Sequence, residues 1–266
     1  VPDTKGGFGC AVVGFGDAKA RKRGRFALAA AVPSLPARVF ALAETPEEFE
    51  TENELLGWLM AGYSFDRYRS PAPERAQLVC PKGADCTRIE AIAAGEALTR
   101  DLVNTPASDM GPDALEAAAQ ELAEQFGAGF AVTRGAHLLE QNFPMIHTVG
   151  RAAAQEPRLL DMRWGEHGPK LTLVGKGVCF DTGGLNLKPG ASMAIMKKDM
   201  GGAATVLGLA HMIMSLGLPL QLRVLIPAVE NAVAGNAFRP GDILTSRKGL
   251  TVEINNTDAE GRLVLA

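Results

Sequence analysis

The stretch LTLVGKGVCFDTGGLNLK, residues 171–188, places a short apolar strand directly before a glycine-rich segment that carries charged residues. We predict a strand over 171–174 and a glycine-rich loop region over 175–202. A helix is expected from about 203 to 216, followed by a mostly apolar strand over 221–226. This alternation of strand, helix and strand predicts an α/β fold, in which a mixed sheet is flanked by helices.

Similar signals extend away from this stretch in both directions. Pro112 opens an amphipathic pattern typical of a helix over 112–125, and Gly127 closes it. Short apolar runs predict strands over 131–133 and 159–163 and a hairpin over 242–245 and 251–254. The sheet therefore draws on strands from most of the second half of the chain.

The first part of the chain predicts a smaller N-terminal α/β domain over residues 1–86. Thr45-Pro46-Glu47-Glu48 has the composition of a helix start, with a capping threonine and proline at the first helical position. A short strand is expected over 77–80. Residues 87–107 are expected to form a linker helix, which Pro106 stops, and residues 108–266 the larger domain.

Two features near the N-terminus favour no ligand site. Gly14-Phe15-Gly16 begins like a dinucleotide-binding loop, but Lys19 occupies the place of the third glycine, so we predict a strand end and a turn. The basic residues nearby are expected to form a solvated face; they are Lys19, Arg21, Lys22, Arg23 and Arg25.

Composition excludes several classes of protein. The 266 residues include 27 Lys and Arg and 30 Asp and Glu, a net charge of −3, which argues against a dedicated nucleic-acid binder. We find no apolar run near the roughly 20 residues that cross a bilayer, and no secretory signal at the start. Four cysteines without a CxxC pair favour free thiols in a reducing cytosol, so a cytoplasmic location is expected.

Charged residues near the predicted strand ends define the candidate site. Lys176, Asp181 and Lys188 follow the strand over 171–174, Asp199 precedes the next helix, and a last group follows the hairpin: Asp258, Glu260 and Arg262. In an open α/β sheet the crevice beyond the strand ends is where ligands bind. Four carboxylates in one crevice repel each other, and a pair of divalent ions such as Mg, Mn or Zn balances them best.

Other catalytic motifs fail in the same region. A phosphate-binding loop ending near Lys176 needs glycine at position 170 and a hydroxyl at 177, where the chain has Lys170 and Gly177. The segment Gly190-Ala191-Ser192-Met193-Ala194 lacks the last glycine of a nucleophile elbow, and no strand is predicted before it. A protein nucleophile is therefore not required.

Two motifs resemble the leucyl (cytosol) aminopeptidase family of two-metal exopeptidases. Residues 256–263 read NTDAEGRL, and 174–202 look like that family's first metal-binding segment. Weaker resemblance covers 100–112 and 52–65, so the likeness runs from about residue 45 to the end. The resemblance implies that 108–266 is a metallopeptidase catalytic domain lacking its C-terminal part, and that the N-terminal domain is incomplete.

The resemblance also implies a role for each site residue. Asp181 and Glu260 would bridge two divalent ions, Zn or Mn; Lys176 and Asp199 would complete one coordination sphere, and Asp258 the other. Lys188 and Arg262 would be catalytic: Lys188 would hydrogen-bond the scissile carbonyl oxygen, and Arg262 would hold a bicarbonate-like anion. Met196 and Asn256 would bind the substrate.

The activity that the resemblance implies is release of N-terminal residues from peptide substrates, with a leucine-like preference. A homo-hexamer in the cytoplasm, without membrane or nucleic-acid partners, is the implied setting. Two alternatives stay open: a metal-dependent hydrolase of another substrate class, such as a phosphoester, and a non-catalytic DNA-binding relative.

Overall fold

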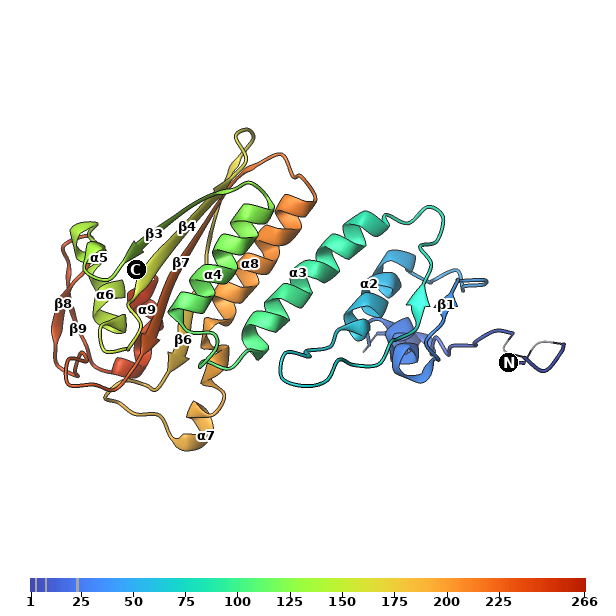
Figure 1. The fold of residues 1–266 in the computed structure, drawn as a ribbon, viewed down its shortest axis with the longest axis horizontal. Coiled ribbons are helices and arrows are strands. Elements are labelled where there is room, and N and C mark those ends of the chain that lie inside the picture. Colours follow the sequence, from blue (N-terminus) through green and yellow to red (C-terminus); the bar gives the residue numbers. More distant parts are fainter. Residues whose placement is uncertain (3, 8, 23) are drawn as a thin grey trace. The chain divides into compact units, whose positions relative to one another are not determined.

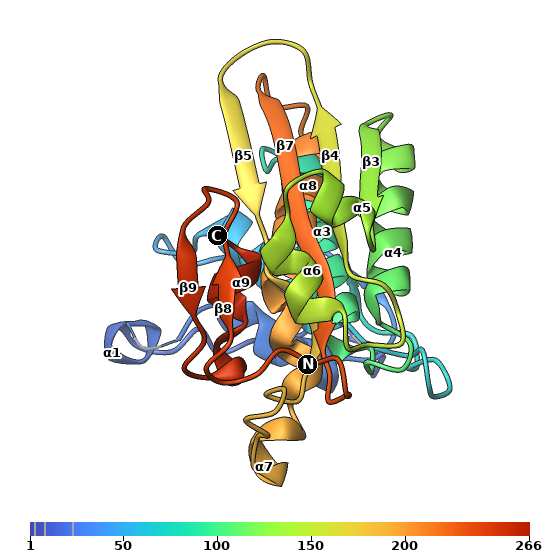
Figure 2. The same ribbon diagram turned by 90° about the vertical axis from the view of Figure 1, so that its left-hand side faces the viewer.

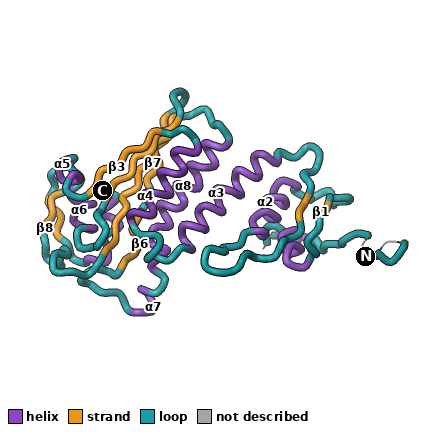
Figure 3. The backbone as a smooth tube through the Cα atoms, in the orientation of Figure 1, coloured by secondary structure: helices purple, strands orange, loops and turns teal. Residues whose placement is uncertain are grey.

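The computed structural model describes residues 1–2, 4–7, 9–22 and 24–266, so Arg23 of the predicted basic face lies outside the described residues. The chain forms two compact units, residues 1–97 and 98–266. Figure 1 labels the elements of both units, and Figure 3 shows which segments are helices, strands and loops.

A five-stranded mixed sheet forms the centre of the second unit (Figure 2). Its strands are β3 (Gly129–Arg134), β4 (Arg158–Trp164), β5 (Lys170–Val174), β6 (Gly177–Asp181) and β7 (Gln221–Asn231). β4 pairs with β3 and β7 in antiparallel fashion, whereas β5 and β6 both run parallel to β7. β7 therefore pairs with three of the other four strands of the sheet.

Helices cover both faces of this sheet, as Figure 1 shows. α4 (Pro112–Gln125) and α8 (Gly201–Ser215) pack on one face, and α6 (Pro144–Gly150) packs on the other with α5 (His137–Glu140). Leu115 and Leu207 are buried in the core under α4 and α8, and Val229 belongs to the core on the opposite face. The predicted mixed sheet flanked by helices is confirmed.

The sequence pattern explains α4 well. Pro112 occupies the first helical turn, where its missing N–H costs no helical hydrogen bond. Leu115, Ala119 and Leu122 follow at intervals of three and four, and all three are buried against the sheet. Gly127 has a φ of +63°, the left-handed conformation that commonly follows a helix end.

The sheet differs from the prediction in two places. Residues 177–181, expected as part of a glycine-rich loop, form β6, which pairs with the far end of β7 and shifts register between Val178 and Asp181. β7 continues past the predicted end at residue 226 to Asn231, through Pro227, which pairs with Leu159. The extra length carries β7 to the candidate site. The hairpin is confirmed as β8 (Ile243–Thr245) and β9 (Thr251–Glu253).

The first unit is a smaller α/β arrangement around η1 (Ala27–Ser34) and α2 (Thr51–Gly62), with a short parallel pair, β1 (Val39–Phe40) and β2 (Gln77–Leu78). Leu28, Val32, Trp58 and Ala76 form its core. The helix start predicted at Thr45 is wrong, because α2 begins at Thr51. Residue Phe49 packs on this core and against the Phe15 ring, 5.4 Å away, which leaves residues 45–50 outside the helix.

The cysteine prediction is partly wrong. Cys80, beyond β2, and Cys86, the first residue of α3 (Cys86–Asn104), form a disulfide across a separation of six residues. Cys10 and Cys179 are free; Cys179 is buried in the core beneath α4 and α8, as a packing role predicts. Gly14-Phe15-Gly16 forms a loop and no strand, followed by the short helix α1 (Ala18–Arg21).

Candidate metal centre

Three separate segments bring the predicted charged residues together. Asp181 is the last residue of β6, and Lys176 lies in the joint between β5 and β6. Asp199 lies in η2 (Met196–Met200), just before α8. Asp258 lies in η3 (Thr257–Ala259), and Glu260 directly precedes α9 (Gly261–Val264). The sheet thus gathers residues up to 84 positions apart, from 176 to 260.

Lys176 links two of the carboxylates. Its Nζ lies 2.8 Å from Asp199 Oδ2 and 2.6 Å from Glu260 Oε1. A Cβ on Gly261 would lie 3.0 Å from both Cε and Nζ of Lys176, and a Cβ on Gly202 would lie 2.9 Å from the Lys176 backbone nitrogen. Glycine at these two positions therefore makes room for the lysine.

Lys188 links the other two carboxylates. Its Nζ lies 2.9 Å from Asp181 Oδ2 and also contacts Asp258 Oδ1. The lysine is held by a tight turn, in which its backbone N–H donates to the Thr182 carbonyl. Gly183 has a φ of +88°, and a Cβ there would lie 2.4 Å from the Asn186 carbonyl oxygen, so the turn requires glycine.

Three of the carboxylates can converge on one point. Single oxygens of Asp181, Asp258 and Glu260 all lie within 4.8 Å of one another. Glu260 is 1% exposed, and its Oε2 is buried with no hydrogen-bond partner among the described residues. A buried carboxylate oxygen without a donor is costly, and a cation satisfies it. Carboxylate oxygens with one amine nitrogen form a donor set suited to Zn²⁺ or Mn²⁺.

Burial and charge shift the pKa of each central group. Burial, together with the nearby charge of Asp181, raises the pKa of Glu260 despite its contact with Lys176. Burial alone would raise the pKa of Asp181, but its contacts with Lys188, the Gly183 N–H and Asn231 outweigh that effect and lower it. Burial likewise disfavours the charged forms of Lys176 and Lys188, but their paired carboxylates raise the pKa of both.

The other predicted site residues lie around this cluster. Met196 is buried at the start of η2, three residues before Asp199. Asn256 is exposed and caps η3, its Oδ1 accepting a hydrogen bond of 2.8 Å from the Asp258 N–H. Arg262 is exposed in α9 and makes no hydrogen bond or ion pair with the residues that the structure describes.

A buried polar network around the cluster was missed in the sequence. Thr257 is fully buried; its Oγ1 donates to the Gly183 carbonyl at 2.6 Å and accepts from the Asn186 N–H at 2.8 Å. Asn231, at the end of β7, reaches both Asp181 and Thr257. No local signal marks Asn231 as a site residue, because it lies beyond residue 226, where the sequence predicts the strand to end.

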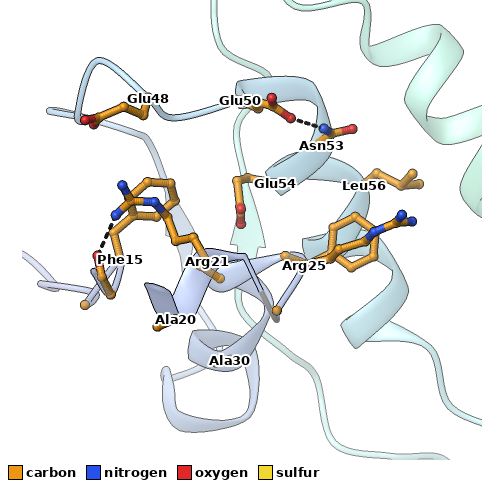
Figure 4. Close-up of a pocket in the computed structure, with 15 residues that line it drawn as sticks. Phe15, Ala20, Arg21, Arg25, Ala30, Glu48, Glu50, Asn53, Glu54 and Leu56 are labelled. Atoms are coloured by element: carbon orange, nitrogen blue, oxygen red, sulfur yellow. Dashed lines mark hydrogen bonds between the residues drawn. The ribbon is translucent and has the colours of Figure 1, made fainter. Parts of the chain in front are cut away.

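A separate pocket lies in the first unit (Figure 4). It has a volume of about 920 Å³, and its wall includes Gly14, Phe15 and Gly16. Two of its charged groups contact protein partners: Arg21 donates to the Gly16 carbonyl and lies over the Phe15 ring, and Glu54 accepts from the Leu28 N–H. These contacts hold the two side chains in place. None of the predicted metal ligands is among the residues that line this pocket.

Comparisons with known proteins identify the class of protein. A family model described as "Cytosol aminopeptidase family, catalytic domain" matches residues 97–266, and one described as "M17 aminopeptidase, N-terminal domain" matches residues 1–81. The chain therefore belongs to the cytosol aminopeptidase family.

Individual relatives agree with this assignment. A probable cytosol aminopeptidase from Syntrophotalea carbinolica is 42% identical over 227 residues, which cover 79% of this chain and 46% of that protein. The crystal structure of a cytosol aminopeptidase from Coxiella burnetii has a TM-score of 0.91 and 43% identity, covering 100% of this chain and 57% of that one. The bottromycin maturation enzyme BotP in complex with Mn has a TM-score of 0.84 and 36% identity, covering 100% of this chain and 60% of that one.

The chain spans about half the length of the curated relatives it matches. None of the helices in the described part of the chain is long and apolar enough to cross a membrane.

Proposed function

We propose that this chain carries the catalytic centre of a metal-dependent aminopeptidase, which removes N-terminal residues, leucine-like ones preferred, from peptides. The observation that carries the proposal is the convergence of Asp181, Asp258 and Glu260 within 4.8 Å, with the buried Glu260 Oε2 left without a donor. Membership of the cytosol aminopeptidase family supports the same activity.

We assign the metal ligands as follows. Asp181 and Glu260 would be shared by two divalent ions, Zn or Mn; Lys176 and Asp199 would hold one of them, and Asp258 the other. When bound, the two ions supply the Lewis acidity that activates water at neutral pH. The donor set supports this assignment because carboxylates can bridge two ions about 3.5–4 Å apart. The Mn complex of BotP, a relative of similar fold, agrees with a divalent metal.

Lys176 has to be a neutral amine to bind metal. With carboxylates as its only charged neighbours, the pKa of Lys176 is raised, and its proton is retained. Divalent cations at the cluster invert the sign of the local charge and so favour loss of that proton. Lys176 would therefore lose its proton to solvent when metal is held here, because Asp199 and Glu260 must stay ionised to act as ligands.

The remaining residues handle the substrate. Lys188, already placed between Asp181 and Asp258, donates to the scissile carbonyl oxygen and stabilises the negative charge that develops there. Arg262, exposed at the start of α9, would hold a bicarbonate-like anion, which would supply a general base. Met196 lines the pocket for the first side chain of the peptide, and Asn256, beside Asp258, contacts the substrate.

The cellular setting belongs to the same proposal. Relatives named cytosol aminopeptidase support a cytoplasmic location, and we propose a homo-hexamer by family resemblance.

Hydrolysis of a leucine anilide, with and without a chelator, tests the proposed function. We expect activity that is lost on chelation and restored by Zn²⁺ or Mn²⁺. Asp181→Asn removes a ligand and should abolish turnover, whereas Asp161→Asn, a carboxylate outside the cluster, should retain it. Activity that survives exhaustive chelation, or phosphatase activity without peptidase activity, would overturn the proposal.

A further inference from the structure

Asn231 is a buried polar side chain that the proposed mechanism does not use. It is 1% exposed and ends β7, the strand that pairs with β4, β5 and β6. Its Nδ2 donates to Asp181 Oδ1 at 2.8 Å and to the Thr257 carbonyl at 3.1 Å. One amide therefore joins Asp181, in the first motif, to Thr257, the residue just before Asp258 in the second.

These contacts give the two carboxylate oxygens of Asp181 different partners. Oδ1 accepts two hydrogen bonds, from Asn231 and from the Gly183 N–H, both at 2.8 Å. Oδ2 instead lies on the side of the cluster, 2.9 Å from Lys188 Nζ. A carboxylate whose one oxygen is held by two donors keeps a fixed orientation and presents the other oxygen to a ligand.

The backbone carbonyl of Asn231 is also held by hydrogen bonds. Its carbonyl accepts from both the N–H and the hydroxyl of Thr182, at 3.1 Å and 2.7 Å, so the two strand ends are tied beside Asp181. A Cβ on Gly184 would lie 3.0 Å from Asn231 Oδ1, which shows how closely the turn packs on this amide. The amide position is therefore set by the end of β7 and by the turn that follows β6.

We infer that Asn231 is a positioning residue for the metal centre, which makes Asp181 bind metal through Oδ2 alone and fixes the peptide unit that precedes Asp258. This inference rests on the proposed function, because it concerns the same cluster. Its consequence is that a bridge made by Asp181 passes through a single oxygen atom. Loss of the amide leaves Oδ1 with the Gly183 N–H as its one remaining donor, so the carboxylate is held less firmly and can rotate or bind through both oxygens.

Mn²⁺ binding to Asn231→Ala tests the inference, measured by calorimetry and by the electron paramagnetic resonance spectrum of the bound ion. We expect the affinity to fall by about 10- to 100-fold, the usual effect of removing a group that orients a ligand. We also expect the spectrum to change, because the coordination of Asp181 changes. Asn231→Ser, which cannot reach both acceptors, is measured alongside in case the alanine variant does not fold.

Val229→Ala is the matched control, because Val229 is fully buried two residues away in β7 and belongs to the core that faces α6. It loses stability through a cavity but should keep the wild-type affinity and spectrum. If the Asn231 variants bind Mn²⁺ like Val229→Ala, the positioning role is wrong while the proposed function stands. If the wild-type protein binds no Mn²⁺ or Zn²⁺, the proposed function fails and this inference fails with it.

Discussion

At the scale of single residues, the site depends on positions where a larger side chain cannot fit. Lys176 lies against Gly202 and Gly261, and a Cβ on either glycine would crowd it. The Lys176 amine can therefore contact Asp199 and Glu260 because these two neighbouring glycines have no side chain. The motif glycines act on the geometry of a ligand as well as on the backbone.

Gly261→Ala tests this point directly. The new methyl group would lie 3.0 Å from Lys176 Nζ, so the flexible end of the lysine has to move away from Glu260. We expect Mn²⁺ affinity, measured by titration calorimetry, to fall by about tenfold or more, while helix α9 is retained.

Gly201→Ala is the control for that variant. Gly201 begins α8, and a Cβ there has no atom within 4 Å in the described part of the chain. Alanine in a helix is favoured over glycine by about 0.5–1 kcal/mol. We therefore expect unchanged affinity and equal or greater stability. Equal affinities for Gly261→Ala and wild-type protein would contradict the account.

At the scale of elements, ion pairs fix α4 to the sheet. Arg158 of β4 is 4% exposed, and its Nη1 lies 2.5 Å from Glu116 Oε2 of α4. Arg134 of β3 contacts the same carboxylate. Burial acts to raise the pKa of Glu116, but the two guanidinium groups outweigh it and lower the pKa below its ordinary value.

Glu116→Gln should therefore destabilise the protein in a pH-dependent way. A lowered folded-state pKa stabilises the protein above the unfolded-state pKa of about 4.3, and this contribution is lost as the pH falls through the folded-state value. At pH 7 we expect a loss of about 1–3 kcal/mol, because the buried Arg158 charge keeps only the largely exposed carboxylate of Asp113 as an ion-pair partner. The difference from wild type, measured by urea unfolding, should shrink below about pH 4.

Asp161→Asn provides the comparison for this prediction. Asp161 pairs with Arg223 at 2.8 Å and with Arg163 at 3.0 Å, but both arginine side chains are largely solvated, 41% and 64% exposed. Exposed pairs contribute at most about 1 kcal/mol. A pH-independent loss in Glu116→Gln, or an equal loss in both variants, would show that burial of the pair is not what matters.

The elements also show what a sequence can predict. α4 was predicted at its observed bounds because its capping, apolar spacing and final glycine agree locally. β6 was missed because Gly177 and the glycines around it read as a loop, and only pairing with β7 makes the segment a strand. α2 begins after the predicted capping threonine because packing of Phe49 on the core prevails over the local signal.

The candidate site shows the same difference between features that local sequence predicts and features that depend on tertiary contacts. Residues that carry charge in the two motifs could be proposed from sequence, because their chemistry is visible in the side chains themselves. Asn231 could not, since β7 was predicted to end at residue 226, before Pro227, and the pairing that carries the strand further is a tertiary contact. Local patterns identify reactive groups, whereas the residues that orient them depend on the assembled sheet.

At the scale of the whole molecule, the two units match different family models, and the metal cluster lies entirely within residues 98–266. The net charge of −3 gives no basic surplus for a nucleic-acid partner. The central proposal therefore concerns the second unit alone. In it, four carboxylates and one neutral lysine would hold two divalent ions.

Elemental analysis of the metal content per chain tests that claim most directly. After loading with Zn²⁺ or Mn²⁺ and removal of free ions, we expect two ions per chain, and fewer in Asp181→Asn, which lacks a bridging carboxylate. Folding is checked on the same samples by circular dichroism. A folded wild-type protein that retains two ions would support the account, and one that retains none would contradict it.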